Sequence, residues 1–535
     1  MKRLILFLIL VSILPQLPTV AARRPNVILM MADDCGYEAL ACNGGTTYET
    51  PTFDRIASAG MRFTQCYSQP VCTPSRVKIM TGQSNARNYV AFGVLREGEV
   101  TFGNVLKAAG YKTCVTGKWQ LSGNAGKKIR TGLKTPSSGP RASVFSSGKD
   151  GEVGDVGSIV DAAGYSQTKN EPLEARGGFQ TGPMGMWWQD CGFDESCMWA
   201  YAHYLQPKDL EHYRNSSKLK KGKSSSRFWK PSIIENGQYR PTTEADFGPD
   251  IYTDFILDFI ERNQDEPFFV YYPMALTHAP FVPTPHSKGF TSRDKFASNR
   301  KYFGDMVRYS GHLMGRIIGK LEEIGIAEET LVIFTCDNGT GRGVESWMGD
   351  RLVMGGKAFP IDAGTHVPMI ATWKGTIEPG SVCHDLVEFS DFMPTLAELG
   401  HAKVPTDRVL DGRSFLPQLK GQKGNPRDSV VVHYDKDPRS ATPKFRRVRF
   451  AFDGRHKLYL DGRMIDVPND YLEQAPLDMK QATTATLNAW ARLQSALATL
   501  PAWSPDNSSF KGKPSKDFQK LLDVHAKVME TRRTK

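Results

Sequence analysis

The sequence predicts an α/β fold in which a large, mostly parallel sheet is sandwiched by helices and followed by a smaller α+β subdomain. Three continuous apolar runs, at residues 26–31, 268–272 and 331–335, have the pattern of strands that are covered on both faces. Apolar residues at helical spacing occupy residues 305–321, between the second and third runs. Strands that alternate with helices in this way favour a parallel sheet with a helix layer on each face.

The chain of 535 residues is long enough for one large domain with an appendage. We expect the large domain to cover residues 23–422 and a C-terminal α+β subdomain to cover residues 423–535. The other elements predicted in the large domain are helices at 52–59, 101–109, 250–262 and 391–399 and strands at 111–115 and 369–372. The subdomain is predicted to contain strands at 429–433, 447–452 and 456–460 and helices at 484–500 and 515–530.

Residues 1–22 have the pattern of a secretory signal peptide. Lys2 and Arg3 form a basic head, residues 4–14 are apolar, and small residues at 20–22 suit cleavage. An uncleaved membrane anchor is the alternative. No later stretch of the sequence is long and apolar enough for a membrane helix, so we expect no membrane attachment after cleavage.

The formal net charge is +11, and removal of Lys2 and Arg3 with the signal peptide would leave +9. This surplus suits an anionic substrate, although scattered basic residues usually form a solvated surface. No nucleic-acid-binding motif accompanies the charge, so we expect no nucleic acid partner.

The chain has nine cysteines. In an exported protein an odd number leaves one unpaired, which suits a cysteine that is chemically converted. Cys191 and Cys197 bracket a short loop and are the best candidates for a local disulfide. Several of the others lie in apolar strands and are equally compatible with buried thiols.

Oxygen-bearing side chains follow two of the predicted strands. Asp33 and Asp34 come just after the first apolar run, and Asp337 and Asn338 come just after the third. The carboxyl ends of parallel strands meet at one edge of the sheet, where ligands bind. Four hard oxygen donors predict one bound Ca²⁺ rather than Mg²⁺, because so many protein ligands leave little room for retained water. A polar turn after a buried strand is the alternative for the acid pair.

The segment Cys72-Thr73-Pro74-Ser75-Arg76 opens a predicted helix. A cysteine at a helix N-terminus meets backbone N–H groups that favour a thiolate or a bound oxyanion, and Arg76, one turn later, carries a guanidinium that binds the same anion. Proline suits the first turn because its missing N–H has no intrahelical partner there. A buried thiol on a capped helix is the alternative.

These residues resemble the type I sulfatases, whose signature is Cys-x-Pro-Ser-Arg. The resemblance extends to Asp33-Asp34-Cys35-Gly36, Gly117-Lys118-Trp119, Thr277-His278-Ala279-Pro280 and Gly355-Gly356-Lys357, and covers the chain to about residue 422. It implies an alkaline-phosphatase-like fold and hydrolysis of sulfate esters. It also implies that a formylglycine-generating enzyme converts Cys72 to formylglycine, whose hydrate contacts the metal and attacks sulfur.

The same resemblance assigns roles to the charged residues around Cys72. Arg76, Lys118 and Lys357 would neutralise the sulfuryl oxygens, where negative charge develops in the transition state. His278 would protonate the leaving oxygen. The alternatives are a histidine merely hydrogen-bonded in a turn and lysines at the surface.

Two positions depart from the family pattern. Gln120 replaces the histidine that helps to expel sulfate, and because glutamine does not take a proton near neutral pH we expect it to act as an orienting residue only. His366 stands where the family has an arginine before Val-Pro, and the sequence offers no explanation for the change.

The middle of the chain is less regular. Residues 125–182 are rich in Gly, Ser and Lys and are predicted to form an inserted loop region. Aromatic residues at 186–190 and 199–201 are compatible with a sugar or aryl platform, although core packing is the more frequent role. A basic loop follows at residues 218–230.

The function predicted from the sequence is hydrolysis of a sulfated glycan or small molecule, such as an aryl sulfate, by a protein that is secreted or periplasmic, or lysosomal or extracellular in a eukaryote. In a eukaryotic host Asn215 and Asn507 would lie in glycosylation sequons. One alternative is a formylglycine-dependent phosphodiester or phosphonate monoester hydrolase. The other is a glycan-binding homologue with impaired catalysis, for which Gln120 is the only support.

Overall fold

The structure is a computed structural model that describes residues 24–123, 143–144, 158–159, 185–199, 227–438, 446–504 and 515–534. The predicted signal peptide at 1–22, most of the predicted insertion at 125–182, and Asn215 and Asn507 lie outside the described residues. Within the described part, no helix combines the length and the apolar character needed to cross a membrane.

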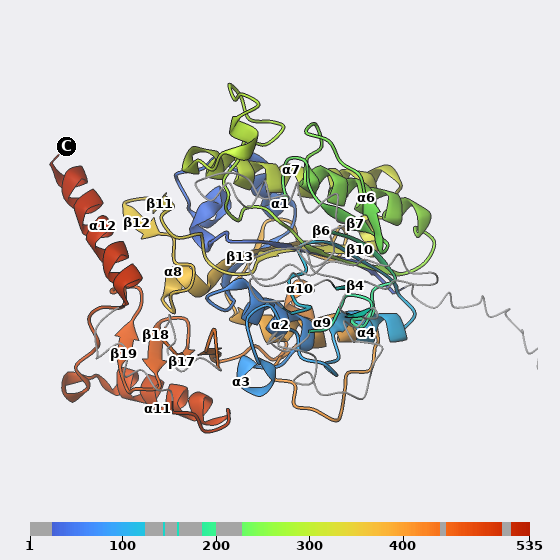
Figure 1. The fold of residues 1–535 in the computed structure, drawn as a ribbon. Helices are drawn as coiled ribbons and strands as arrows, with labels where there is room; N and C mark the ends of the chain where they lie inside the picture. The colour runs from blue at the N-terminus through green and yellow to red at the C-terminus, as the bar shows by residue number, and fades with distance from the viewer. Residues whose placement is uncertain are drawn as a thin grey trace, which may run out of the picture.

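Five neighbouring strands form the parallel centre of a large mixed sheet (Figure 1). Their order in space is β10, β1, β9, β3 and β6, and every neighbouring pair is parallel. The bounds are β1 (Asn26–Ala32), β3 (Lys112–Gly117), β6 (Glu195–Trp199), β9 (Phe268–Pro273) and β10 (Thr330–Cys336). All five carboxyl ends therefore reach the same edge of the sheet, and the predicted α/β class is confirmed.

The strands on either side make the sheet mixed. Next to β10, β13 (His366–Thr372) pairs antiparallel with both β10 and β2 (Met61–Tyr67), so β2 points the same way as the central strands. The strand β2 was not among the elements predicted from the sequence. The remaining strands of this sheet are β7 (Ile233–Glu235), β8 (Gln238–Arg240), β14 (Ser381–Cys383) and β15 (Val387–Glu388). The insertion contributes a separate pair, β4 (Ser143–Val144) and β5 (Ser158–Ile159).

Helices cover both faces of the sheet (Figure 1). One layer contains α1 (Pro51–Ala59), α6 (Gly248–Arg262) and α7 (Phe303–Glu323). The other contains α2 (Cys72–Thr81), α4 (Phe102–Ala108), α9 (Phe392–Leu399) and α10 (Leu416–Leu419). Shorter helices are α3 (Asn85–Asn88) and α8 (Asp362–Thr365). The apolar spacing predicted for residues 305–321 is confirmed, because Met306, Leu313 and Ile317 of α7 are all buried.

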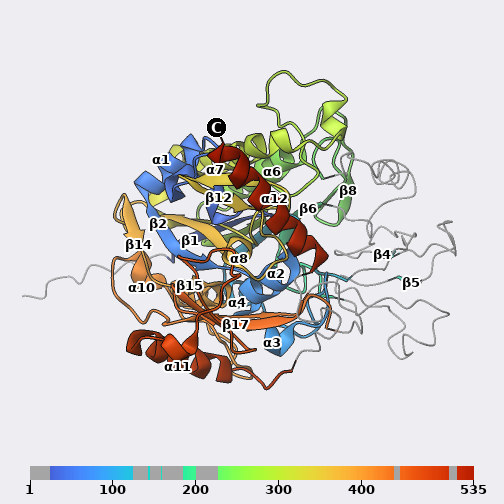
Figure 2. The ribbon, with the colours of Figure 1, turned by 90° about the vertical axis from the view of Figure 1, so that its left-hand side faces the viewer.

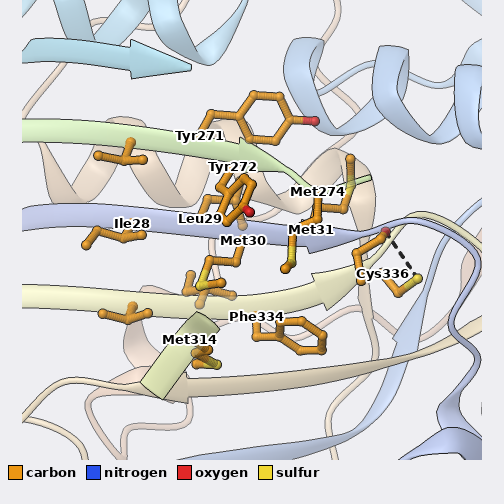
Figure 3. Packing of buried hydrophobic residues seen from close by; sticks show 14 of the residues in the cluster. Ile28, Leu29, Met30, Met31, Tyr271, Tyr272, Met274, Met314, Phe334 and Cys336 are labelled. Carbon is orange, nitrogen blue, oxygen red and sulfur yellow. Dashed lines mark hydrogen bonds between the residues drawn. The ribbon is translucent and has the colours of Figure 1, made fainter. Parts of the chain in front are cut away.

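The core lies where the central strands meet these helices. Ile28 and Met30 of β1 and Phe334 of the adjacent β10 have no exposed surface, and Figure 3 shows them with Tyr272 among the packed side chains of the core. Each large apolar side chain that is fully buried contributes about 1.5–3 kcal/mol relative to an exposed one. This packing fixes the strands and therefore the position of the loops that follow them.

The C-terminal residues form a second, four-stranded antiparallel sheet of β16 (Val430–Tyr434), β17 (Val448–Phe452), β18 (His456–Tyr459) and β19 (Met464–Asp466). Helix α11 (Thr484–Ala498) packs Leu493 and Leu497 on this sheet. Helix α12 (Lys516–Arg533) packs Leu521 instead on the hairpin of β11 (Glu345–Met348) and β12 (Arg351–Met354) (Figures 1 and 2). The two helices that we expected in one subdomain thus cover different surfaces, and the boundary at residue 422 stays a prediction.

The disulfide predicted between Cys191 and Cys197 is wrong. All nine cysteines are described, and all are free. Cys197 lies inside β6, where it pairs with Thr116 of β3 and with Glu235 of β7. Cys191 belongs to the turn before β6 and donates its backbone N–H to Trp187. Both thiols are fully buried, which raises their pKa and makes them chemically quiet.

Candidate active site

The loops after the parallel strands bring most of the predicted site residues together. Asp33 follows β1, Asp337 follows β10, Lys118 follows β3 and His278 follows β9 by a short loop. Asp33 and Lys118 are in direct contact, and His278 lies beside Asp34. Because these strands are parallel, residues more than 300 positions apart in sequence lie in one cluster.

Cys72 is the first residue of α2, as the sequence predicts, with Val71 as the N-cap. Its Sγ and carboxylate oxygens of Asp33 and Asp337 all lie within 4.8 Å of one another. Cys72 is only 3 % exposed, and every residue of α2 is buried. The strand β2 before this helix points toward the same sheet edge, which is why α2 begins at the site.

The four predicted oxygen donors form one cluster. The backbone N–H of Asp34 donates to Asp337 Oδ1 at 3.2 Å, and Asn338 Nδ2 donates to Asp34 Oδ1 at 2.9 Å. Asp33 Oδ1 and Asn338 Oδ1 are buried and have no hydrogen-bond partner among the described residues. Unpartnered oxygen acceptors beside several carboxylates are the donor set that a hard divalent cation takes, so these residues fit calcium.

Two lysines balance the acid pair. Lys118 Nζ donates to Asp33 Oδ2 at 2.7 Å, and Lys357 Nζ donates to Asp34 Oδ2 at 2.6 Å. Burial alone would raise the pKa of both carboxyls, but Lys118 beside Asp33 and Lys357 beside Asp34 hold each pKa below its usual range. Asp337 shows the opposite balance, because burial and the charge of Asp33 raise its pKa despite Arg76. A cation at this cluster would relieve that repulsion.

Arg76 links the elements that surround the site. It donates two hydrogen bonds to Asp337 and one to the carbonyl of Lys118, and it is 1 % exposed. The sequence places Arg76 at the sulfuryl oxygens, whereas its contacts in the structure tie α2 to the loops after β10 and β3.

The loop that carries Lys357 is fixed from three sides. The backbone N–H of Lys357 donates to Thr340, and that of Ala358 donates to Pro70, just before α2. A Cβ on Gly356 would lie 2.3 Å from the backbone of Ala363, so only glycine allows this close approach. The glycines before Lys357 therefore let the loop fold back onto the site.

The C-terminal segment holds the same loop from outside. Glu473 is buried and accepts hydrogen bonds from the Asp362 backbone at 2.9 Å, from Lys457 and from Tyr459. Lys457 and Tyr459 also donate to the carbonyl of Pro360 at 3.3 and 3.1 Å. We call Glu473, Lys457 and Tyr459 the Glu473 clamp. It connects the small sheet to the turn that follows Lys357.

His278 faces the acid pair through one ring nitrogen. Its Nδ1 lies 2.5 Å from the carbonyl of Ala279, and because a carbonyl only accepts, Nδ1 carries the hydrogen. Its Nε2 lies 3.7 Å from Asp34 Oδ2. Burial and then the positive charge of Lys357 lower the pKa of His278 to about 3. The ring is therefore neutral near pH 7 in the protein alone, with Nε2 free to take a proton.

The two departures from the family pattern have different surroundings. Gln120 has a positive φ of 53°, and its buried Oε1 has no hydrogen-bond partner in the described part of the chain. His366 instead stacks between Tyr37 and Tyr67, with ring centroids 4.1 and 4.8 Å away, and its Nε2 donates to the carbonyl of Thr64. Packing thus explains His366, which the sequence left unexplained.

Arg227 is a buried cation at the site that the sequence did not predict. Arg227 Nη1 lies 3.7 Å from Asp33 Oδ2, and its guanidinium carbon lies 4.2 Å from the ring centroid of Trp199. Arg227 belongs to the stretch 218–230, which its composition marked only as a basic loop. The aromatic residues expected as a platform or as core, including Trp187 and Trp188, are buried in the core.

Comparisons with known proteins agree with this geometry. The family model described as sulfatase matches residues 25–139 and 176–402. The chain belongs to the sulfatase family. A model described as the C-terminal region of N-sulphoglucosamine sulphohydrolase matches residues 355–481.

Curated members of the sulfatase family align over most of the chain. Human steryl-sulfatase is 29% identical over 458 residues, which cover 77% of this chain and 73% of the relative. Human arylsulfatase A is 30% identical over 431 residues, which cover 77% of this chain and 71% of the relative. Mouse N-acetylgalactosamine-6-sulfatase is 28% identical, with 80% and 72% covered. Membership in this family makes the chain a sulfuric ester hydrolase.

Solved structures share the fold at low sequence identity. One from work on glycosaminoglycan metabolism by Bacteroides thetaiotaomicron has a TM-score of 0.60 at 21% identity and covers 89% of this chain and 99% of its own. A phosphonate monoester hydrolase of Agrobacterium radiobacter has a TM-score of 0.59 at 17% identity, with 89% and 96% covered. These likenesses support the alkaline-phosphatase-like fold alone.

Proposed function

We propose that this protein is an exported sulfatase that hydrolyses sulfate esters of a carbohydrate through one bound calcium and a formylglycine made from Cys72. The observation that carries the proposal is the convergence of Cys72 with Asp33 and Asp337, whose ligand atoms all lie within 4.8 Å of one another. A nucleophile that contacts a divalent cation needs this proximity.

Asp33, Asp34, Asp337 and Asn338 would hold the calcium, since their side chains form one cluster in which Asp33 Oδ1 and Asn338 Oδ1 have no hydrogen-bond partner among the described residues. The ion would polarise the bound sulfate group and favour the deprotonated nucleophile. Formylglycine would supply a hydrated aldehyde with one hydroxyl for attack on sulfur and a second for release of sulfate. Oxidation of Cys72 by a formylglycine-generating enzyme would take place during maturation.

The other residues act on charge and protons. Lys118 contacts Asp33, and Lys357 contacts Asp34. Both lysines would bind sulfuryl oxygens as the substrate enters. His278 Nε2 is placed to give a proton to the leaving oxygen once protonated. Burial and Lys357 lower the pKa of His278, and the negative charge of a bound sulfate ester would act in the opposite direction.

A carbohydrate sulfate is the substrate class that we favour. The model that matches residues 355–481 describes an N-sulphoglucosamine sulphohydrolase region. One structure with a TM-score of 0.60 and 19% identity, covering 93% of this chain and 99% of its own, is described as a complex with its substrate D-glucosamine-2-N,6-O-disulfate. The pattern of residues 1–22 supports export to the periplasm or cell exterior, or to lysosomes in a eukaryote.

The test begins with protein expressed alongside a formylglycine-generating enzyme. Mass spectrometry of the peptide that contains Cys72 should find formylglycine, and the same protein should release sulfate from nitrophenyl sulfate and from members of a panel of sulfated sugars. Cys72→Ser should keep the thermal melting curve and lose turnover by several orders of magnitude, as expected when a covalent nucleophile is removed.

Matched substrates distinguish a sulfatase from the main alternative, a formylglycine-dependent phosphodiester or phosphonate monoester hydrolase. Nitrophenyl esters of sulfate, of a phosphate diester and of a phosphonate share one leaving group, so their kcat/KM values compare the acid groups directly. We expect the sulfate ester to be preferred. Full activity with an unmodified Cys72, or a clear preference for the phosphonate or the diester, would contradict the proposal.

A further inference from the structure

We infer that Arg227 binds the sulfate group of the substrate, as a third cation beside Lys118 and Lys357. The inference rests on the proposed function, because it assigns a residue to the same sulfate pocket. Arg227 lies outside every motif that links this chain to the sulfatase signature.

The position of Arg227 follows from the sheet. Trp199 is the last residue of β6, the fifth parallel strand, and so lies at the same sheet edge as Asp33 and Lys118. The guanidinium of Arg227 stacks on Trp199 and extends to Asp33, with Nη1 3.7 Å from Oδ2. Lys118 Nζ lies 2.7 Å from that same oxygen. Two cations thus converge on one carboxylate oxygen, Lys118 from the end of β3 and Arg227 from the segment before β7.

The backbone around Arg227 is held in place by α6. The N–H of Gly248, the first residue of α6, donates to the carbonyl of Phe228 at 2.8 Å. A Cβ at position 248 would lie 2.4 Å from the carbonyl oxygen of Arg227, so glycine is required for this approach. The aromatic ring of Trp199 then fixes the guanidinium plane, and the arginine needs little reordering when an anion arrives.

The hydrogen-bonding state of Arg227 indicates a missing ligand. The side chain is 9 % exposed, yet Nε and Nη1 have no hydrogen-bond partner among the described residues. The ion pair to Asp33 at 3.7 Å is too long for a hydrogen bond. Buried N–H donors without an acceptor are unfavourable, so native proteins rarely leave them without a role. An oxyanion in the pocket would supply the acceptors.

Arg76 is the other buried arginine of the site, and it differs on this point. Its Nε, Nη1 and Nη2 all donate to Asp337 or to the carbonyl of Lys118. Three of the five N–H groups of Arg76 are therefore committed to acceptors within the protein. Nε and Nη1 of Arg227 have no hydrogen bond within the described part of the chain that a sulfate would have to replace. Arg227 is therefore the arginine that we assign to the sulfate.

The scissile sulfate suits Arg227 better than a second acidic group on the sugar. Arg227 and Lys118 share the same oxygen of Asp33 as their carboxylate partner. Arg227 therefore lies among the residues that surround the ester itself.

The experiment measures inorganic sulfate and nitrophenyl sulfate, neither of which carries a second acidic group. Arg227→Gln removes the charge and Arg227→Lys retains it. Arg240→Gln is the matched control, since Arg240 is an exposed arginine of β8 paired with Glu235. Calorimetry should show that Arg227→Gln weakens sulfate binding roughly 10- to 100-fold, as expected for loss of a charged hydrogen bond, and kcat/KM should fall by a similar factor. Arg227→Lys should lie between, and Arg240→Gln should match the wild type.

Unchanged sulfate affinity in an Arg227→Gln variant with a wild-type melting curve would overturn the inference. The same holds if Arg227→Gln affects only sugars that carry a second anionic group. If the wild type binds inorganic sulfate through Arg227 but hydrolyses no sulfate ester, the inference stands and the proposed function fails. If it hydrolyses sulfate esters and Arg227→Gln does so equally well, the inference fails and the proposed function stands.

Discussion

Arg76 and Asp337 form a buried ion pair in which Nε and Nη2 of the arginine donate to the same carboxylate oxygen, at 3.1 and 2.8 Å. Neither side chain is more than 1 % exposed. The pair joins α2, which begins at Cys72, to the loop after β10. It therefore sets the distance between the predicted nucleophile and two of the predicted metal ligands.

Loss of this pair should destabilise the protein strongly. Arg76→Ala leaves Asp337 as a buried carboxylate without its main partner, which costs about 3–5 kcal/mol in comparable cases. Denaturation in urea measures the free energy of unfolding. Arg262→Ala is the control, because Arg262 forms an exposed pair with Glu195 at 2.8 Å and its loss should cost about 1 kcal/mol or less. Equal effects of the two changes would show that Asp337 has other support.

Replacement of Asn338 should weaken the binding of calcium. Asn338 is a better target than Asp337, which also anchors Arg76. Asn338→Ala removes the unpartnered Oδ1 from the cluster without changing the net charge. Metal analysis should find one calcium in the wild type and less in the variant, and chelation should lower the melting temperature of the wild type only. Asn469→Ala, at an exposed position, should retain the ion. Zinc, or full activity without metal, would contradict the assignment.

Gln120 should slow the release of sulfate. Without an imidazole at this position, no group there takes the proton of the second hydroxyl, while departure of the alcohol keeps its acid and lysines. Rapid mixing with nitrophenyl sulfate should show a burst of phenol near one equivalent per enzyme. Gln120→His should shrink the burst if the ring fits the space around the unpartnered Oε1. Linear release from both proteins, with turnover that follows leaving-group acidity, would rule this out.

The Glu473 clamp should support both stability and the position of Lys357. Glu473→Ala leaves Lys457 buried and unpaired, at a cost of about 3–5 kcal/mol, and it frees the Asp362 backbone N–H. Glu473→Leu combined with Lys457→Met should cost less than Glu473→Ala, because the double change leaves no buried charge. Urea denaturation measures the stabilities, and the KM for nitrophenyl sulfate should rise as the loop loosens. An equal cost for the double change would show that the clamp acts through packing alone.

Asp362 should contribute to stability only above acidic pH. Burial raises its pKa, but the nearby charges of His366, Lys457 and Arg351 lower it to about 2. In the unfolded chain the pKa of an aspartate is about 3.9, so the unfolded state binds the proton more readily than the folded state does. Asp362 therefore stabilises the fold when it is ionised, and this contribution is lost as the pH falls toward 2. The difference in unfolding free energy between wild type and Asp362→Asn should shrink with acidification. A constant difference would contradict the shifted pKa.

Much of the site was predictable because it follows strand ends. The apolar runs identified β1, β9 and β10, and parallel strands necessarily bring Asp33, His278 and Asp337 to one edge. The motif around Cys72 likewise predicted a helix N-terminus. These conclusions needed only local pattern and one topological rule.

Other parts depend on contacts that local pattern does not encode. Arg227 lies in a stretch whose composition indicates a basic surface, and it becomes a site residue only because Trp199 and Gly248 hold it there. The strand β2 alternates partly buried and buried residues and lacks the continuous apolar run of the central strands. The pairing of Cys191 with Cys197 was inferred from spacing, whereas the sheet holds Cys197 in register with Thr116.

Because α2 is completely buried, the proposed oxidation of Cys72 has to take place before this helix packs into the fold. All ten residues of this helix are buried, and Cys72 is only 3 % exposed. An enzyme that oxidises Cys72 has to reach its side chain, and in the folded protein the packed helix buries it. Under the proposed oxidation of Cys72, the yield of active protein then depends on two rates. These are the rate at which the modifying enzyme oxidises Cys72 and the rate at which the new chain folds. Slower folding would raise the active fraction, and a chain that folds first would remain a stable, inert product that later addition of the enzyme does not rescue.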